Sequence, residues 1–358
     1  MKILSKINNT VTGCDLMDSL NLIIFNSGIN PDSFLILIDK KVLDLYKDEL
    51  LNQLTKLGKP LSVSVIEPGE KQKDILKIPG IIKPLLGNKC DRQACLISIG
   101  GGVVTDIGGF ISAIWLRGIK SIFIPTTLLA QIDSAIGGKN GVNLTLEKGQ
   151  MLKNMLGTFK QPDLIISDVK FLKTLPDQEI INGLGEMVKY HIGWGTPSAE
   201  ELLKFKTLIK RNDWEQAGKI IVKCQKIKMK IVDKDPLERS GIRQKLNFGH
   251  TVGHAIEAVT GGKLSHGEAV GIGLVAAAKI SVLKGLLREN NYLIIRNLIS
   301  ELGLPLSVSK IDKTKLFKTL NFDKKGGTFV LIEDIGELVT DVIVEQKIIN
   351  LALNEVIL

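Results

Sequence analysis

Apolar runs of strand length, which alternate with charged segments of helical character, constrain the fold of this chain most strongly. The first three are NLIIF at 21–25, SFLILID at 33–39 and LSVSVIE at 61–67. Continuous apolar runs rich in β-branched residues are typical of strands that are buried on both faces of a parallel sheet. We therefore predict three strands here, βαβ units and an α/β fold.

A glycine-rich turn follows the next apolar run. ACLISIG at 94–100 leads into Gly100, Gly101 and Gly102, and VVTDIGGFISAIWLRG then predicts a helix. A glycine turn at a helix amino terminus can bind phosphate, because backbone N–H groups point outward and no Cβ blocks a close approach. The pattern is not GxGxxG, and such turns also occur for packing alone. Its place directly after a buried strand favours the nucleotide interpretation.

Other polar residues stand near predicted strand ends. Asp39, at the end of its run, suits a ribose hydroxyl and an ordinary turn equally well. Thr126 and Thr127 follow a strand predicted at 122–124 and should lie at the carboxyl edge of the sheet, where ligands bind in such folds. Asp133 and Lys139 either face one cleft or form a surface ion pair.

The composition limits the class of protein. With 358 residues, 44% of them hydrophobic, the chain can bury a large core, and its length suggests two domains. Its longest apolar stretch, 269–278, is far shorter than the roughly 20 residues of a membrane span. Cys14, Cys90, Cys95 and Cys224 form no CxxC pair, which suits a reducing compartment. We expect a cytoplasmic protein with no membrane span, whose metal site would use histidine and carboxylate.

The net charge does not indicate a nucleic-acid partner. The formal charge of +9 comes from 47 basic against 38 acidic residues, mostly lysines spread along the chain. Aromatic residues are only 5% and are not interleaved with the basic ones, so a stacking platform for single strands is not indicated. A small anionic substrate explains a locally basic site more simply.

Three of the four histidines are clustered in the carboxyl-terminal half. On a helix, His250 and His254 would present both imidazoles on one face, about 6 Å apart. Gly261 and Gly262 then end that helix, and His266 begins another apolar run. A lone histidine is more often a satisfied core residue than a ligand, but three together favour a metal site.

Long helical periodicity begins near Pro176. Glu186, Lys189 and Tyr190 project from one face of a predicted helix. Glu186 lies in an apolar stretch, where a buried carboxylate needs a cation. That cation is either Lys189, in a simple helix pair, or zinc bound by the histidines.

Arg243 and Asn247 precede the histidines at helical spacing. Gly241 and Gly249, however, argue against one continuous helix through this segment.

A set of motifs then identifies a family. These motifs are PGEKQK at 68–73, GGGVVTD at 100–106, LRG at 116–118, PTTLLAQIDSAIGGKNGVN at 125–143, LKNMLGTFKQP at 152–162, LKTLP at 172–176, GLGEMVKY at 183–190, LNFGHTVGHAIE at 246–257 and HGEAV at 266–270. Together they resemble the 3-dehydroquinate synthases, of the sugar phosphate cyclase superfamily, over nearly the whole chain. The glycerol dehydrogenases share that fold and a metal site, but not this set of motifs.

The resemblance implies two domains with the active site between them. Residues 1–170 would form a Rossmann-like NAD-binding domain, and residues 171–358 a mainly α-helical domain that binds zinc and substrate. It assigns zinc, or cobalt as a substitute, to Glu186, His250 and His266. It places His254 beside the substrate phosphate, whereas spacing alone would make His254 a metal ligand as well.

The resemblance also implies the residues that bind cofactor and substrate. The matching NAD positions are Asp39, Glu70, Lys73, Gly101, Gly102, Asp106, Thr126, Thr127, Lys139, Lys153, Phe171, Thr174 and Gln178. The matching substrate positions are Asp133, Lys139, Asn154, Lys189, Lys228, Arg243, Asn247, His254 and one of Lys324 and Lys325. Arg117 corresponds to an arginine that reaches across a homodimer interface toward the phosphate.

The implied reaction is a phosphate-eliminating lyase step of the shikimate pathway, which supplies chorismate and the aromatic amino acids. In the family, 3-deoxy-D-arabino-heptulosonate 7-phosphate is oxidised at a ring hydroxyl that zinc polarises, loses phosphate, regains the hydride and closes to 3-dehydroquinate. Arg243 and Lys228 suit the substrate carboxylate. The alternatives are another cyclase, of the valiolone or deoxy-inosose type, and a metal-dependent NAD polyol dehydrogenase.

Three segments depart from the family pattern. Extra residues precede Lys153, so that Lys148 competes with it for the same role. The segment between Lys228 and Arg243 is slightly long. The chain is short after DKK at 323–325, which leaves open whether Lys324 or Lys325 meets the phosphate.

Overall fold

The computed structural model describes residues 1–87, 90–146, 151–320 and 327–358. Within them the chain divides into two compact units. The first comprises Met1–Leu175 with Leu208–Lys228, and the second comprises Pro176–Thr207 with Met229–Leu358. The break after Leu175 replaces the predicted one after residue 170, and the segment 208–228 returns to the first unit.

Hydrogen bonds explain why this segment returns. It contains most of α7 (Trp214–Lys234). Gln225 of α7 is buried, accepts from Thr12 Oγ1 at 2.8 Å and donates to the Gln131 carbonyl at 2.9 Å. Gly218 packs so closely that a Cβ there would lie 2.3 Å from Leu4 Cδ1. These contacts are long-range, so helical periodicity alone does not reveal them.

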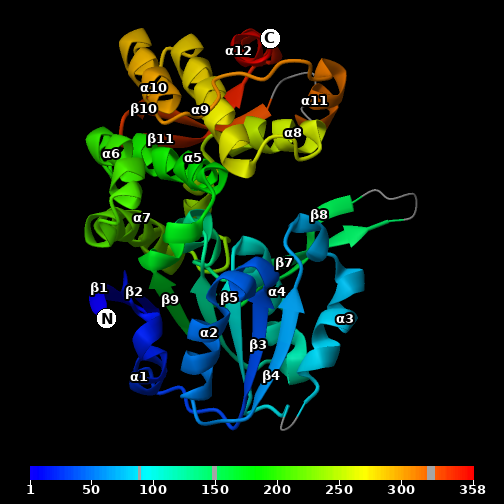
Figure 1. The fold of residues 1–358 in the computed structure, drawn as a ribbon. Helices are drawn as coiled ribbons and strands as arrows, with labels where there is room; N and C mark the ends of the chain where they lie inside the picture. Colours follow the sequence, from blue (N-terminus) through cyan, green and yellow to red (C-terminus); the bar gives the residue numbers. More distant parts are fainter. Residues whose placement is uncertain (88–89, 147–150, 321–326) are drawn as a thin grey trace. The chain divides into compact units, whose positions relative to one another are not determined.

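A seven-stranded sheet forms the first unit (Figure 1), with the strand order β1-β2-β9-β6-β5-β3-β4. β1 pairs antiparallel with β2, and every other neighbouring pair in the sheet is parallel. This arrangement confirms the predicted α/β fold. The strands are β1 (Lys2–Ile7), β2 (Thr10–Cys14), β3 (Phe34–Asp39), β4 (Leu61–Ile66), β5 (Cys95–Gly100), β6 (Lys120–Pro125) and β9 (Leu164–Asp168).

The central strands of the sheet are buried on both faces, whereas the edge strands β1 and β4 are partly exposed. In β3, Ile36 and Ile38 belong to one core cluster, whereas Leu35 and Leu37 belong to the other. Successive side chains of a strand point to opposite faces, so a strand between two cores is apolar throughout. The flanking helices are α1 (Leu20–Asn26) and α2 (Lys40–Thr55) in the first cluster, and α3 (Ile78–Ile82) and α4 (Gly102–Ile114) in the second.

The strand predicted at 21–25 is wrong, because these residues lie in α1. Leu20, Ile23 and Ile24 are buried and Phe25 is exposed, which is the spacing of a one-sided helix. A run this short does not separate strand from helix by periodicity. The first strands of the chain are β1 and β2 instead.

A two-stranded hairpin, β7 (Lys139–Thr145) with β8 (Met151–Phe159), follows β6 in the first unit. Val142 pairs with Leu156 and Leu144 with Leu152, so the residues between Leu152 and Leu156 bulge opposite Asn143. Lys153 and Asn154 lie in this bulge. Lys148 lies outside the described residues.

The second unit is mainly helical and is built around α9. This helix is buried along most of its length and packs against α5, α8, α10, α12 and β10. Among the described helices, α9 alone is long and apolar enough to cross a membrane, but 72% of it is buried in the unit, as expected of a core helix. The elements are α5 (Asp177–Trp194), α6 (Ala199–Lys210), α8 (His250–Thr260), α9 (His266–Leu283), α10 (Glu289–Glu301), α11 (Lys313–Leu320), α12 (Gln346–Val356), β10 (Gly327–Asp334) and β11 (Glu337–Val344).

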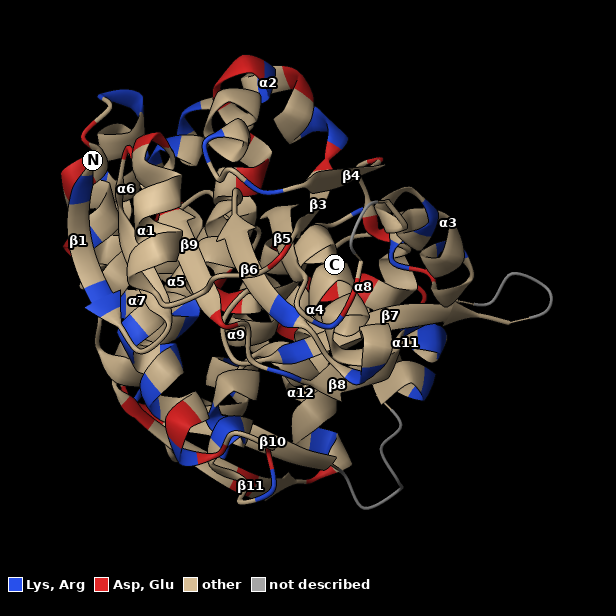
Figure 2. Ribbon diagram, turned by 90° about the horizontal axis from the view of Figure 1, so that it is seen from below, with Lys and Arg blue, Asp and Glu red and all other residues tan. Residues whose placement is uncertain are grey.

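Charged residues lie mainly on helices and turns. Figure 2 shows Lys and Arg on several helices rather than gathered on one element. The central strands β3, β5 and β9 are free of Lys and Arg, and their acidic residues, Asp39 and Asp168, stand at strand ends.

Candidate functional site

Glycines bring three helices of the second unit into close contact. A Cβ on Gly185 of α5 would lie 2.3 Å from the carbonyl oxygen of Gly267 in α9, and one on Gly267 would lie 2.0 Å from that of Asn182. A Cβ on Gly273 of α9 would lie 2.0 Å from the carbonyl oxygen of Gly249, which precedes α8. Only residues without a side chain permit these approaches.

The same contacts bring a carboxylate and the histidines together. Glu186, next to Gly185, is fully buried, and its Oε1 lies 3.0 Å from His250 Nε2 and 3.2 Å from His266 Nε2. His254 is the third histidine of the cluster, in which ring-nitrogen ligand atoms lie within 4.8 Å of one another. Its ring centroid is 4.9 Å from that of His250 and 5.7 Å from that of His266.

The outer nitrogens of two imidazoles already have oxygen partners. His250 Nδ1 lies 3.1 Å from the Phe248 carbonyl, and His266 Nδ1 lies 3.1 Å from Glu257 Oε2. A carbonyl or carboxylate oxygen accepts a hydrogen bond, so Nδ1 donates, and Nε2 presents a lone pair whenever the ring is neutral. In that state two such lone pairs would face Glu186 Oε1, and a metal ion bound among them would take the place of a proton. Two imidazoles, each fixed by an oxygen at Nδ1, and one carboxylate form a donor set that fits zinc.

The charges of these groups are strongly coupled. Burial opposes ionisation of Glu186, but Lys189 and His250 outweigh it and hold the pKa of this carboxyl well below its usual value. Burial opposes protonation of His266, but the hydrogen bonds that it donates to Glu186 and Glu257 raise its pKa to about 9. Desolvation and the two other histidines lower the pKa of His254 to about 4, although part of its side chain is exposed, so His254 is neutral near pH 7.

Lys189 is a second cation for Glu186. It is buried, forms an ion pair with Glu186 Oε2 and donates to the Leu246 carbonyl at 3.0 Å. Lys189 and the histidines therefore approach different oxygens of one carboxylate, so the ion pair with Lys189 does not exclude a metal at the histidines. Tyr190 is buried beside it, with its ring centroid 5.2 Å from Lys189 Nζ.

Arg243 and Asn247 lie on a separate short helix, Ile242–Asn247. Gly241 and Gly249 both have positive φ, 79° and 77°, so the predicted interruption on each side is confirmed. Arg243 is buried, its backbone N–H donates to Asp235 Oδ2 at 3.3 Å and its Nη1 donates to the Pro236 carbonyl at 3.1 Å. Its guanidinium is thus held by the preceding loop.

In the first unit, the strand order has a topological switch point between β3 and β5. The chain goes from β3 outward to β4 and returns to β5 on the other side of β3, so the connections diverge there. Ligands of open α/β sheets bind beyond the strand ends at such a switch point. Asp39 ends β3, Gly100 ends β5, and a Cβ on Gly100 would lie 3.2 Å from Asp39 Cβ.

The glycine turn at this switch point also has a packing role. A Cβ on Gly101 would lie 3.0 Å from Thr127 Cγ2, and one on Gly102 would lie 2.8 Å from Ser134 Oγ. The bare backbone at the start of α4 remains suited to a phosphate. Thr126 is buried and donates its N–H to the Gly100 carbonyl at 2.9 Å.

Asp39 caps α2. Its Oδ1 accepts from the backbone N–H groups of Lys41 at 2.8 Å and Val42 at 3.4 Å. Its helix-capping role therefore accounts for this aspartate at the strand end without any ligand.

Four predicted residues form one polar network around the β7–β8 hairpin. Lys73 forms a buried ion pair with Asp106 and donates to Asn154 Oδ1 at 2.6 Å. Glu70 Oε1 accepts from Asn143 Nδ2 at 2.9 Å, and Asn143 Oδ1 accepts from the Asn154 N–H at 2.8 Å. Burial raises the pKa of Asp106, although Lys73 opposes that shift.

Asp133 forms an ion pair with Lys228 of α7. Lys228 Nζ lies 2.9 Å from Asp133 Oδ1 and also donates to the Asp133 carbonyl at 2.6 Å. Lys228 is buried at its position in α7, so this pair is partly shielded from solvent. Lys139 is exposed at the start of β7.

Tyr46 of α2 links two further predicted residues. Its ring meets that of Phe171 edge-on at 5.2 Å, and its hydroxyl lies 2.8 Å from Thr174 Oγ1.

Gln178 is exposed in α5, and Arg117 is exposed after α4, with φ of 72°. Lys324 and Lys325 lie outside the described residues.

Two polar residues of these networks were not predicted. Asn143 is fully buried in β7, and Glu257 holds His266 from α8. Both stand within the motifs quoted above, but their partners are distant in sequence, so no local pattern identifies them.

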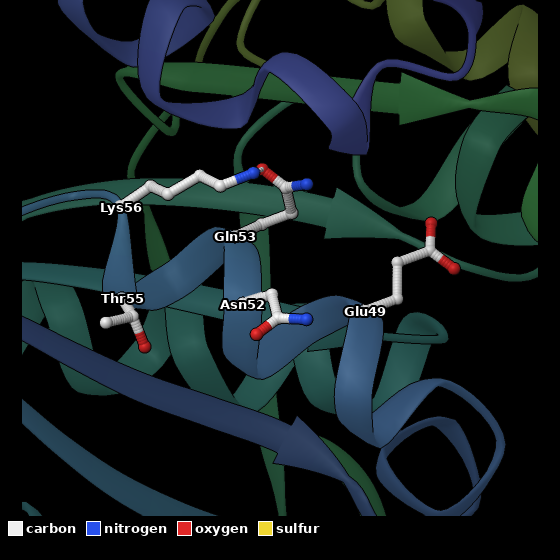
Figure 3. A pocket seen from close by; sticks show the side chains of 5 residues that line it. All are labelled: Glu49, Asn52, Gln53, Thr55 and Lys56. Carbon is white, nitrogen blue, oxygen red and sulfur yellow. Dashed lines mark hydrogen bonds between the residues drawn. The ribbon is translucent and has the colours of Figure 1, made fainter.

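A shallow hollow on α2 contains none of the predicted residues (Figure 3). Glu49, Asn52, Gln53, Thr55 and Lys56 line it, and Lys56 Nζ donates to Gln53 Oε1 at 3.4 Å. It lies on the carboxyl-terminal half of α2, away from Asp39, where that helix begins.

Comparison with known proteins places the chain in one family. Residues 63–182 match the family model described as 3-dehydroquinate synthase N-terminal, and residues 183–326 match that described as 3-dehydroquinate synthase C-terminal. The 3-dehydroquinate synthase of Thermodesulfovibrio yellowstonii is 40% identical over 326 residues, which are 89% of each chain.

Solved structures of related cyclases have the same fold. A 2-epi-5-epi-valiolone synthase from Streptomyces hygroscopicus, with NAD+ and Zn2+ bound, has a TM-score of 0.85 and 26% identity and covers 99% of this chain and 98% of its own. A 2-deoxy-scyllo-inosose synthase, complexed with carbaglucose-6-phosphate, NAD+ and Co2+, has a TM-score of 0.85 and 23% identity and covers 97% of this chain and 96% of its own.

Proposed function

Because this chain belongs to the 3-dehydroquinate synthase family, we propose that it converts 3-deoxy-D-arabino-heptulosonate 7-phosphate to 3-dehydroquinate and phosphate, as a lyase of the shikimate pathway. The observation that carries this proposal is the convergence of His250 Nε2 and His266 Nε2 on Glu186 Oε1. That donor set suits a catalytic rather than a closed structural metal site, because three protein ligands leave coordination positions for substrate.

Glu186, His250 and His266 would hold zinc, or cobalt in its place, and the switch point of the first unit would bind NAD. When bound, the metal would polarise a ring hydroxyl, and NAD would accept a hydride from the carbon that bears this hydroxyl and later return it. Lys189 would remain bonded to the other oxygen of Glu186 and so fix the carboxylate in its metal-facing orientation. Glu257 would fix His266 in the same way.

The remaining residues would bind and orient an anionic substrate. We assign the carboxylate to Arg243, whose planar guanidinium suits it, with Lys228, Asn247 and Asp133 contributing the adjoining polar groups. We assign the phosphate to Lys153, Asn154, Lys139, His254 and one of Lys324 and Lys325. Near pH 7 a neutral His254 would donate a hydrogen bond without adding charge.

NAD would be held by residues at the switch point and in the hairpin network. We assign the cofactor to Asp39, Gly101, Gly102, Thr126 and Thr127, and to the further positions Glu70, Lys73, Asp106, Lys139, Lys153, Phe171, Thr174 and Gln178. The half-buried start of α4 supports a pyrophosphate contact, since its backbone N–H groups favour an anion.

We propose a cytoplasmic homodimer in which Arg117 of one subunit serves the phosphate of the other. The four cysteines are free, which suits a reducing compartment. Leu116 and Arg117 both adopt positive φ, 47° and 72°, and both are exposed. A strained, exposed turn that ends in an arginine supports a contact role for this segment.

The function is tested by supplying the heptulosonate phosphate with zinc and less than one equivalent of NAD. We expect phosphate and 3-dehydroquinate in equal amounts with no net NADH. A preference for sedoheptulose 7-phosphate would instead indicate a cyclase of the valiolone type, the second candidate that the similar structures favour. Steady NADH formation from a polyol would indicate a dehydrogenase.

A further inference from the structure

One asparagine of β7 connects the segments that carry Glu70, Lys73 and Asn154. Asn143 is 0% exposed, its Nδ2 donates to Glu70 Oε1 at 2.9 Å and its Oδ1 accepts from the Asn154 N–H at 2.8 Å. Its backbone N–H donates to the Lys73 carbonyl at 2.6 Å. A single buried residue thus touches both sides of the network.

The bulge in β8 depends on this residue. The ladder is interrupted opposite Asn143, so the Asn154 N–H has the Asn143 side chain in place of a strand partner. Asn154 has φ of 53°, in the left-handed region, which asparagine adopts more readily than most residues with a side chain. In this conformation Asn154 Oδ1 accepts from Lys73 Nζ at 2.6 Å.

We propose that Asn143 is a positioning residue for the reaction, which sets the NAD-side residues Glu70 and Lys73 relative to Asn154 on the phosphate side. This inference rests on the proposed function. A carboxamide suits the task because it donates on one side and accepts on the other. In Asn143→Asp the side chain would keep its acceptor but lose its N–H donor, and the new carboxylate would face that of Glu70.

The same strand offers a matched control. Asn140 is also buried, at 5% exposure, but its Nδ2 donates to the backbone carbonyls of Gly138 at 3.0 Å and Lys160 at 2.9 Å. It therefore holds the base of the hairpin and bonds to no side chain of the network through these contacts. Loss of its donors should lower stability without moving the network.

The test compares Asn143→Asp with Asn140→Asp in the zinc-loaded full chain. We expect Asn143→Asp to raise both KM for the heptulosonate phosphate and Kd for NAD at least roughly tenfold, since a buried hydrogen bond is lost and like charges meet. Asn140→Asp should lower Tm while each constant changes by less than about twofold. Adding Glu70→Gln to Asn143→Asp restores a donor opposite the new carboxylate, so the double variant should bind NAD more tightly than Asn143→Asp alone.

Two results would overturn the inference. One is an Asn143→Asp variant with wild-type KM and Kd; the other is loss of affinity in both variants in proportion to their loss of Tm. If the wild-type chain does not turn over the heptulosonate phosphate, the proposed function fails separately. The role of Asn143 is then decided by titrating NAD and inorganic phosphate calorimetrically, because neither measurement requires turnover.

Discussion

Glu186 Oε1 lies 3.0 Å from His250 Nε2, and both atoms are acceptors when His250 is neutral. Such a pair is stable only with a proton or a metal ion between its members. The His250 Nδ1 contact with the Phe248 carbonyl, at 3.1 Å, assigns the ring proton to the far side. The pair is therefore suited to hold one metal ion, which would take the place of that proton.

The first prediction separates His250 from His254. His250→Ala should lower zinc affinity by more than about 100-fold, because a residue that binds zinc directly should contribute more affinity than one that only orients a ligand. His254→Ala should retain zinc and lose activity, as a substrate-binding residue would. Metal content after dialysis against a weak chelator distinguishes them. Equal zinc loss in both variants would instead indicate that all three histidines of the cluster bind zinc.

A second prediction concerns the helix crossing beneath the metal site. In Gly185→Ala the new Cβ would lie 2.3 Å from the Gly267 carbonyl oxygen, which is too close for non-bonded atoms. The helices α5 and α9 must therefore separate. We expect a loss of roughly 2 kcal/mol in the free energy of unfolding, together with weaker zinc binding. Denaturant unfolding and metal content measure the two effects.

Gly80→Ala in α3 is the control for that substitution. Nothing lies within 4 Å of a Cβ at Gly80, and its φ is not positive. Alanine there should leave stability unchanged or raise it by up to about 1 kcal/mol. If Gly185→Ala behaved like this control, the glycine contact would not hold the site together.

Patterns that depend on neighbouring residues were predictable from the sequence. The runs at 33–39 and 94–100 became β3 and β5, and Gly261 with Gly262 ends α8 before His266 begins α9. Each feature depends on local apolar periodicity or on glycine conformation.

Features that depend on distant partners were not predictable. The Glu257 contact with His266 and the return of α7 to the first unit are fixed by side chains far apart in the sequence. The strand prediction for residues 21–25 was wrong for another reason. A short apolar run fits a buried strand and one face of α1 equally well.

A third prediction is a pH dependence of stability from His191. Burial lowers the pKa of His191, whose Nδ1 lies 2.7 Å from the Pro197 carbonyl. Its pKa in the unfolded chain is about 6.5, so below that pH the unfolded state binds the extra proton and stability falls. His191→Gln should reduce the loss of Tm between about pH 7 and pH 5. If metal-free His191→Gln lost as much Tm over this pH range as the metal-free wild type, the prediction would be contradicted.

The last prediction concerns recognition of the substrate carboxylate. Arg243 is buried, and its backbone N–H and Nη1 are held by Asp235 and Pro236, so its guanidinium is oriented before substrate binds. Arg243→Met should lower kcat/KM for the heptulosonate phosphate by about thirtyfold, or roughly 2 kcal/mol, because the carboxylate loses its bidentate partner. Arg239→Met is the control, since Arg239 is exposed in the same loop and should retain nearly full activity. Zinc content should be unchanged in both variants. Unchanged kcat/KM in Arg243→Met would remove this residue from the site and weaken the choice of a carboxylate-bearing substrate over a neutral sugar phosphate.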